Sequence, residues 1–182
     1  MRRLSAVIAV TLLFAAPALA QDLPSRKPGL WEMKMGFEGR GLPAQTVRQC
    51  VDQATDKRMQ ASFGGLTQEA CSKKDIKNVG GTITMDSVCN LGMGTTTSHA
   101  VVTGSFDSAY TVKMSSTSTG GPAIPGMKAG GETNITIEAR RVGDCEAGQK
   151  PGDMIMANGM KINVLNMPNV ADMMKMIPQA PR

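Results

Sequence analysis

Hydrophobic and polar side chains alternate along much of the chain with a period of two. The stretch 31–37 shows this most clearly: its hydrophobic positions are Trp31, Met33, Met35 and Phe37, and the positions between them hold charged residues or glycine. Successive side chains of a strand point to opposite faces of the sheet, so this stretch predicts a strand with one buried and one solvated face. Similar patterns predict strands at 46–51, 71–89 (a hairpin), 95–104, 108–117 and 133–139.

Short turns join most of these segments, which favours an antiparallel meander. The pattern gives seven strands, and residues 120–131 form a glycine- and proline-rich loop without periodicity. Such a sheet must bury one face. We therefore expect a mainly β domain, with the meander curled into a partial barrel and a short C-terminal helix packed on it.

Two helices are expected. Asp52 is suited to cap a short helix that turns Met59 and Phe63 inward. The C-terminal helix would be capped by Asn169 and stopped by Pro178. Its apolar residues have the spacing i, i+3, i+4, i+7, which is suited to packing on a sheet; they are Val170, Met173, Met174 and Ile177.

The N-terminus has the three parts of a secretory signal peptide. Two arginines precede a short apolar run at 4–16, and the small-residue sequence Ala18-Leu19-Ala20 fits a cleavage site before Gln21. A buried N-terminal helix is the alternative. We expect a signal peptide at 1–20, an exported β domain at 21–153, and a methionine-rich extension with a short helix at 154–182. No other apolar run is long enough to cross a membrane.

All four cysteines follow the expected cleavage site, at positions 50, 71, 89 and 145. No pair has the C-x-x-C spacing of a zinc knuckle or a thioredoxin-like redox site. An even number of cysteines in an oxidising compartment predicts two disulfides, and three connectivities are possible. We favour Cys71 with Cys89 and Cys50 with Cys145.

The Cys71–Cys89 pairing depends on the register of one hairpin that turns at Gly80-Gly81. A three-residue turn over 79–81 would place the two cysteines opposite each other, but it would point Ile76 away from Ile83 and Met85. A slip by one residue would align those apolar side chains and move Cys71 to the wrong face. A β-bulge between Cys71 and Ile76 reconciles both requirements.

Several segments in order resemble a known family. They are KPGLWEMKM after the signal peptide, VRQCVD, the Cys71–Cys89 hairpin and EARRVGDCEAGQKPGDM. Over residues 27–156 the chain resembles the bacterial exported family known as domain of unknown function 3617. The resemblance implies a β-rich domain exported to the periplasm. It implies no activity, so it assigns no catalytic or binding residue.

Composition argues against nucleic acid as a partner. Loss of residues 1–20 removes two arginines, so the formal charge falls from +5 to +3, with 18 basic and 15 acidic residues. No basic cluster exceeds two residues, and aromatic side chains are too few for base stacking. We expect no nucleic-acid partner, and the oligomeric state stays open.

The sequence has no recognisable catalytic motif. The single histidine, His99, lies among threonine and serine residues but without a G-x-S-x-G elbow, and it is interpreted as a surface residue. The glycine-rich segments lack the lysine and helix pattern of a phosphate loop. We therefore expect a protein that is not an enzyme and that needs no cofactor.

Two binding functions are open. A curled sheet with an apolar concave face can hold an apolar small molecule or a lipid, and Trp31, Met33, Met35 and Phe37 are the candidate ligand-binding residues. The alternative depends on methionine, because seven of fourteen in the mature chain follow residue 153. Thioether sulfur binds Cu(I), and the candidate ligands are Met154, Met156 and Met160. The competing interpretation of these methionines is adaptable core packing.

Overall fold

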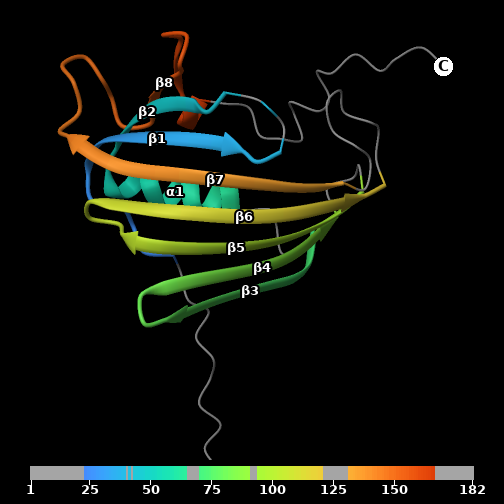
Figure 1. Cartoon of the computed structure of the whole chain (residues 1–182). Coiled ribbons are helices and arrows are strands. Elements are labelled where there is room, and N and C mark those ends of the chain that lie inside the picture. Colours follow the sequence, from blue (N-terminus) through green and yellow to red (C-terminus); the bar gives the residue numbers. More distant parts are fainter. Residues whose placement is uncertain are drawn as a thin grey trace, which may run out of the picture.

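The structure is a computed structural model that describes residues 23–39, 41, 43–64, 70–90, 94–120 and 131–166. Both the signal peptide expected at 1–20 and the helix expected at 169–178 lie outside these residues. The described strands form one antiparallel sheet of nine strands in the order β3-β4-β5-β6-β7-β1-β2-β8-β9 (Figure 1). The strands are β1 Gly29–Phe37, β2 Gln45–Val51, β3 Cys71–Val79, β4 Thr82–Asn90, β5 Thr95–Ser105, β6 Ala109–Thr119, β7 Glu132–Gly143, β8 Asp153–Ile155 and β9 Lys161–Asn163.

The predicted mainly β, antiparallel fold is confirmed, and all seven predicted strands are present. Strands β3 to β7 form the meander, and β7 then pairs with the N-terminal β1. The short strands β8 and β9 were not predicted. The sheet is curled but not closed, since β3 and β9 are its two edges within the described chain.

The β3–β4 hairpin resolves the register conflict as predicted, by a bulge. Cys71 lies opposite Cys89, the register shifts between Cys71 and Lys73, and Ile76 then lies opposite Met85. The predicted three-residue turn is wrong. Val79 pairs with Thr82, and Gly80 and Gly81 alone make the turn, with φ of 59° and 84°. Two successive residues of positive φ are typical of the tight turn that matches the twist of a hairpin.

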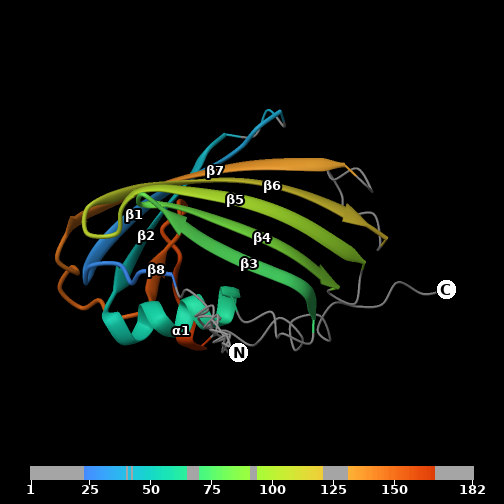
Figure 2. The ribbon, with the colours of Figure 1, turned by 90° about the horizontal axis from the view of Figure 1, so that it is seen from below.

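Helix α1 (Gln53–Gly64) lies on the concave side of the curled sheet (Figure 2). As predicted, Asp52 caps it, because the Thr55 backbone N–H donates to Asp52 Oδ1 at 2.7 Å. Hydrogen bonds from the Thr55 side chain and, second, from its backbone N–H lower the pKa of Asp52. Met59 faces inward, also as predicted, and the side chain of Phe63 lies outside the described part.

The core lies between α1 and the sheet. Trp31, Val51 and Ala139 form its buried centre, and Met33 and Tyr110 pack against it. The Tyr110 and Trp31 ring centroids are 5.6 Å apart. The residues before β1 close one end of this core, since the Trp31 Nε1–H donates to the carbonyl of Lys27 at 2.8 Å.

An ion pair is buried in the same core. Arg26 and Asp56 are 6% and 1% exposed, and the Arg26 backbone N–H and Nε–H each donate to one Asp56 oxygen at 2.7 Å. The guanidinium also donates to Gln49 Oε1 at 3.3 Å and lies 5.9 Å from the centre of the Trp31 ring. The segment before β1 is therefore bound to α1 by an almost fully desolvated charge pair.

Both predicted disulfides are present. Cys50 in β2 is bonded to Cys145 after β7, with Cα atoms 5.3 Å apart, and Cys71 is bonded to Cys89. The first joins residues 95 positions apart, so it links the two ends of the domain. Disulfides of this kind are typical of an oxidising environment outside the cytosol.

The β8–β9 hairpin has an acid-sensitive contact. Asp153 accepts from Lys161 Nζ at 2.6 Å and from the Lys150 backbone and Asn163, and these hydrogen bonds lower its pKa from 3.8 to about 2. A carboxyl group with a depressed pKa stabilises the fold above its unfolded pKa. That contribution is lost as the pH falls through the pKa of the folded state.

We therefore expect the hairpin of the wild-type protein to lose stability between about pH 4 and pH 2, as Asp153 is protonated. Amide hydrogen exchange at Ile155 and Ile162 would measure it. In Asp153→Asn the hairpin should already be weaker at pH 6, and this part of the acid dependence should disappear. An unchanged acid dependence in the variant would contradict the assignment.

Candidate ligand-binding face

The concave face of the sheet carries apolar side chains in continuous rows across the strands. One row runs Met35–Ile137–Val112–Val102–Ile83 and crosses β1, β7, β6, β5 and β4. The next runs Phe37–Ile135–Met114–Ala100–Met85 and ends at Ile76 in β3. Cross-strand neighbours share a face, so each row is one strip of contact surface. We call these two rows, together with Met33, the apolar face.

Much of the apolar face keeps contact with solvent. Val102, Ala100 and Ile83 are buried, but the other side chains of the two rows are only half-buried. Half-buried residues include Met33, Met35, Phe37, Val112, Met114, Ile135 and Ile137. A surface of this size on one side of a sheet suits contact with an apolar molecule.

The four residues that the sequence proposed for ligand binding do not have equal access. Met33, Met35 and Phe37 lie on the apolar face and are half-buried. Trp31 shares that face by alternation but has no exposed surface, because Arg26, Tyr110 and the core surround it. Trp31 is therefore a core residue adjacent to the face, placed to report on a ligand without touching it.

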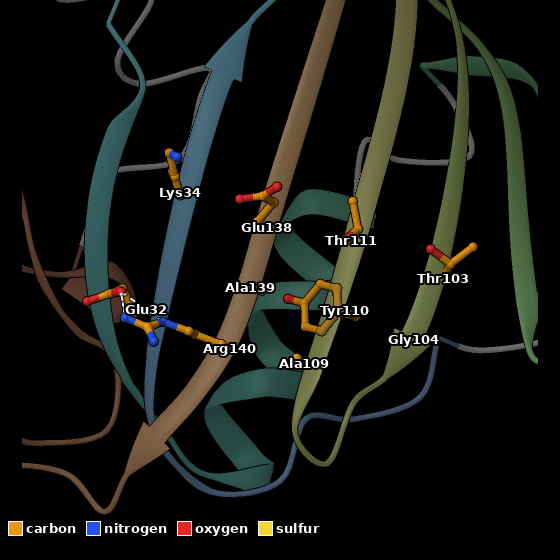
Figure 3. Close-up of a pocket in the computed structure, with 10 residues that line it drawn as sticks. All are labelled: Glu32, Lys34, Thr103, Gly104, Ala109, Tyr110, Thr111, Glu138, Ala139 and Arg140. Carbon is orange, nitrogen blue, oxygen red and sulfur yellow. Dashed lines mark hydrogen bonds and ion pairs between the residues drawn. The ribbon is translucent and has the colours of Figure 1, made fainter.

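The opposite, convex face has a shallow groove of about 510 Å³ lined by charged and hydroxyl side chains (Figure 3). Glu32 is its most constrained carboxylate. It accepts from Arg140 Nη2 at 2.6 Å and from Arg48 Nε at 3.1 Å, and these hydrogen bonds lower its pKa. A carboxylate held ionised between two guanidinium groups is a poor proton acceptor.

His99 is an exposed residue of the same convex face, as its sequence context predicted. Its Nδ1 lies 2.8 Å from Asp86 Oδ1 on the neighbouring strand, and this hydrogen bond lowers the pKa of Asp86. Ser98 and Ala100 on either side of it point to the concave face by alternation. The alternation of side chains along β5 therefore places the histidine on the side opposite the apolar face.

The three methionines proposed for copper share one side of the β8–β9 hairpin. Met154 pairs with Ile162, and the Met156 N–H donates to the carbonyl of Met160 at 2.9 Å, which continues the same register. Met156 therefore lies opposite Met160, and Met154 lies two residues away on the same face. Met160 is 52% exposed.

The buried network of Arg26, Gln49 and Asp56 was not predicted. Part of it had a signal in the sequence. Gln49 and the apolar Cys50 are neighbours in a predicted strand, so their side chains had to point to opposite sides of β2. Nothing local links Arg26 to Asp56, which are 30 residues apart. The alternation within β6 and β7 was visible in the sequence, but not the pairing that continues the apolar face from β1 into these strands.

One comparison with known proteins is decisive. Residues 26–145 match the profile of the family described as Protein of unknown function (DUF3617), which is well over half of the chain. The protein belongs to the DUF3617 family. The match extends from Arg26 of the ion pair to Cys145 of the long-range disulfide, so the DUF3617 region includes α1, both disulfides and the whole apolar face. Strands β8 and β9, with the three methionines, follow it.

Membership of the DUF3617 family confirms the resemblance found in the sequence and brings no activity with it. No curated protein and no solved structure matches the chain. Within the residues described, no helix has the length and hydrophobicity needed to cross a bilayer.

Proposed function

We propose that this DUF3617 protein is an exported, periplasmic binding module for an apolar ligand or envelope component, and that it is not an enzyme. The observation that carries the proposal is the apolar face, whose two rows cross five and six strands while many of their side chains stay half-buried. Apolar side chains that stay accessible as one contiguous surface are typical of an interaction site. The two disulfides support the extracytoplasmic location.

Binding can be measured with N-phenylnaphthylamine, an uncharged apolar fluorophore. The chain has a single tryptophan, and Trp31 lies directly beside the apolar face, so bound probe should accept its excitation energy. We expect saturable quenching of Trp31 emission with a matching rise in probe fluorescence. Absence of any saturable signal from correctly oxidised, folded protein would reject the function.

Met35→Gln and Lys34→Gln form a matched pair for this assay. Met35 belongs to the apolar face, whereas Lys34 is its neighbour on the convex face and is exposed. An amide on the apolar face must be desolvated by a bound apolar molecule, so Met35→Gln should weaken probe binding about tenfold. Lys34→Gln should leave the affinity unchanged. Equal effects of the two variants would show that the probe binds elsewhere.

A second candidate function is Cu(I) binding by the β8–β9 hairpin. The observation that favours it is the register that brings Met154, Met156 and Met160 to one face. Thioether sulfur is a soft ligand that selects Cu(I) over harder cations. A site made from one short hairpin would also be independent of the apolar face.

Replacement of these three methionines by leucine keeps their approximate volume and removes the sulfur. We expect the triple variant to lose Cu(I) in competition with a chromogenic chelator. The matched control replaces Met33, Met85 and Met114 of the apolar face by leucine and should retain the metal. If the hairpin variant binds Cu(I) as tightly as the wild type, these methionines serve packing alone.

A further inference from the structure

The concave face changes from apolar to hydroxyl-bearing at a definite position along the strands. Directly beyond the Phe37–Met85 row, the next cross-strand row consists of Thr133, Ser116, Ser98 and Ser87. We call these four residues the hydroxyl row. It crosses β7, β6, β5 and β4, the same strands that carry the apolar face, so the two surfaces are continuous.

Three hydroxyls of this row are available to a ligand. Ser87, Ser98 and Ser116 are half-buried, and none makes a side-chain hydrogen bond to another residue within the described ranges. One row further along, Thr96 and Ser118 are instead bonded to each other at 3.0 Å. A half-buried hydroxyl that lacks a protein partner is a ready donor and acceptor for a bound polar group.

The dimensions suit an elongated molecule. Along β6 the apolar positions Val112 and Met114 precede Ser116, and Tyr110 lies beyond them in the core. Ser116 lies four positions after Val112, which is a length of about 13 Å along the strand. An extended alkyl chain lying along the strands would contact both apolar rows and bring a polar group at its end to the serines.

The charges near this face favour an uncharged polar group. On the concave side Arg26 and Asp56 already neutralise each other, and Lys74, which continues the row in β3 opposite Ser87, takes part in an interaction of its own. The serines provide both donors and acceptors without net charge, which matches hydroxyl and ester oxygens. The serines carry no positive charge, so they cannot compensate the cost of desolvating a phosphate or carboxylate head group beside them.

Resting on the apolar-ligand function proposed above, we propose that the ligand is a single-chain amphiphile with an uncharged, hydrogen-bonding head group, such as a monoacylglycerol. Its alkyl chain lies on the apolar face and its head group on the hydroxyl row. The orientation is fixed because only one end of the apolar face adjoins the serines.

The test compares monododecanoylglycerol, dodecyl phosphate and the headless probe N-phenylnaphthylamine on the full mature protein with both disulfides formed. Ser98→Ala/Ser116→Ala removes two facing hydroxyls of the row. Thr97→Ala/Ser115→Ala removes two from the convex face of the same strands and is the matched control. Thermal unfolding of each variant verifies that it is folded.

We expect the wild type to bind monododecanoylglycerol more tightly than dodecyl phosphate. Ser98→Ala/Ser116→Ala should weaken the binding of monododecanoylglycerol about tenfold through the loss of two hydrogen bonds. The affinity for N-phenylnaphthylamine should stay unchanged. The control variant on the convex face should leave the affinity for both ligands unchanged.

Other results overturn the inference in distinguishable ways. If the serine variant binds monododecanoylglycerol like the wild type, or loses both ligands equally, the hydroxyl row does not bind a head group, although the apolar-ligand function stands. Tighter binding of dodecyl phosphate rejects the uncharged head group. Failure of the wild type to bind even N-phenylnaphthylamine rejects the proposed function itself.

Discussion

Asp56→Ala should lower the free energy of unfolding by about 3–5 kcal/mol, because it leaves the buried guanidinium of Arg26 without its counter-ion. Both partners are almost fully desolvated, with side chains 7% and 2% exposed, and Nε and Oδ1 are 2.7 Å apart. The substitution also removes the acceptor of the Arg26 backbone N–H. Urea unfolding followed by Trp31 fluorescence measures the loss, since the indole packs against this pair.

The double variant Arg26→Met/Asp56→Leu separates charge from packing. Replacement of a buried ion pair by apolar side chains of similar volume is often neutral or stabilising. We expect it to recover most of the loss, even though the Arg26 N–H stays without its acceptor. Lys57→Ala, at an exposed position of the same helix, is the control and should change stability by no more than about 0.5 kcal/mol. A loss that small in Asp56→Ala would contradict the assigned role.

Removal of the Cys50–Cys145 disulfide should cost about 4–5 kcal/mol, because the bridge closes a loop of 95 residues in the unfolded chain. The Cys71–Cys89 bridge closes only 18, so the same chain-entropy argument gives about 3 kcal/mol. Each pair is replaced by alanine, and urea unfolding is compared with that of the wild type. The long bridge also joins β2 to the segment after β7.

The order of the two losses is the informative result. The Cys71–Cys89 variant is the matched control, because it also removes one disulfide in which one of the two cysteines is buried. If its loss equals or exceeds that of the Cys50–Cys145 variant, loop entropy does not govern these bridges. Non-reducing peptide mapping of the wild type should find both linkages and no free thiol, and a Cys50–Cys71 peptide would contradict the hairpin argument.

The sequence was most informative where the physics is local. In β1 the alternation from Trp31 to Phe37 identified the buried side of the strand, because adjacent side chains of a strand must point apart. In the β3–β4 hairpin, the requirement that Cys71 and Ile76 share one side with their partners predicted the bulge. The turn itself was predicted one residue too long, since Gly80 and Gly81 both adopt positive φ and make a two-residue turn.

The candidate site was only partly predictable. Met33, Met35 and Phe37 were assigned to a ligand-binding face from the alternation of β1 alone. Their neighbours Ile135 and Ile137 come from a strand about a hundred residues later, and no local pattern announces the pairing of β1 with β7. Trp31 looked equivalent to the methionines in sequence, yet Arg26 and Tyr110 bury it, because only the folded chain brings those side chains over the indole.

By itself, then, the sequence determined which side of each long strand is apolar, where the hairpin must bulge, and that Cys71 can face Cys89, since these follow from backbone geometry over a few residues. The tertiary structure determined which side chains from distant segments lie next to one another. It aligned Met35 with Ile137 and Val112, placed the serines beside them, and buried Arg26 against Asp56. Such contacts depend on the order of strands in the sheet, which is chosen by the burial of the whole face rather than by any single segment.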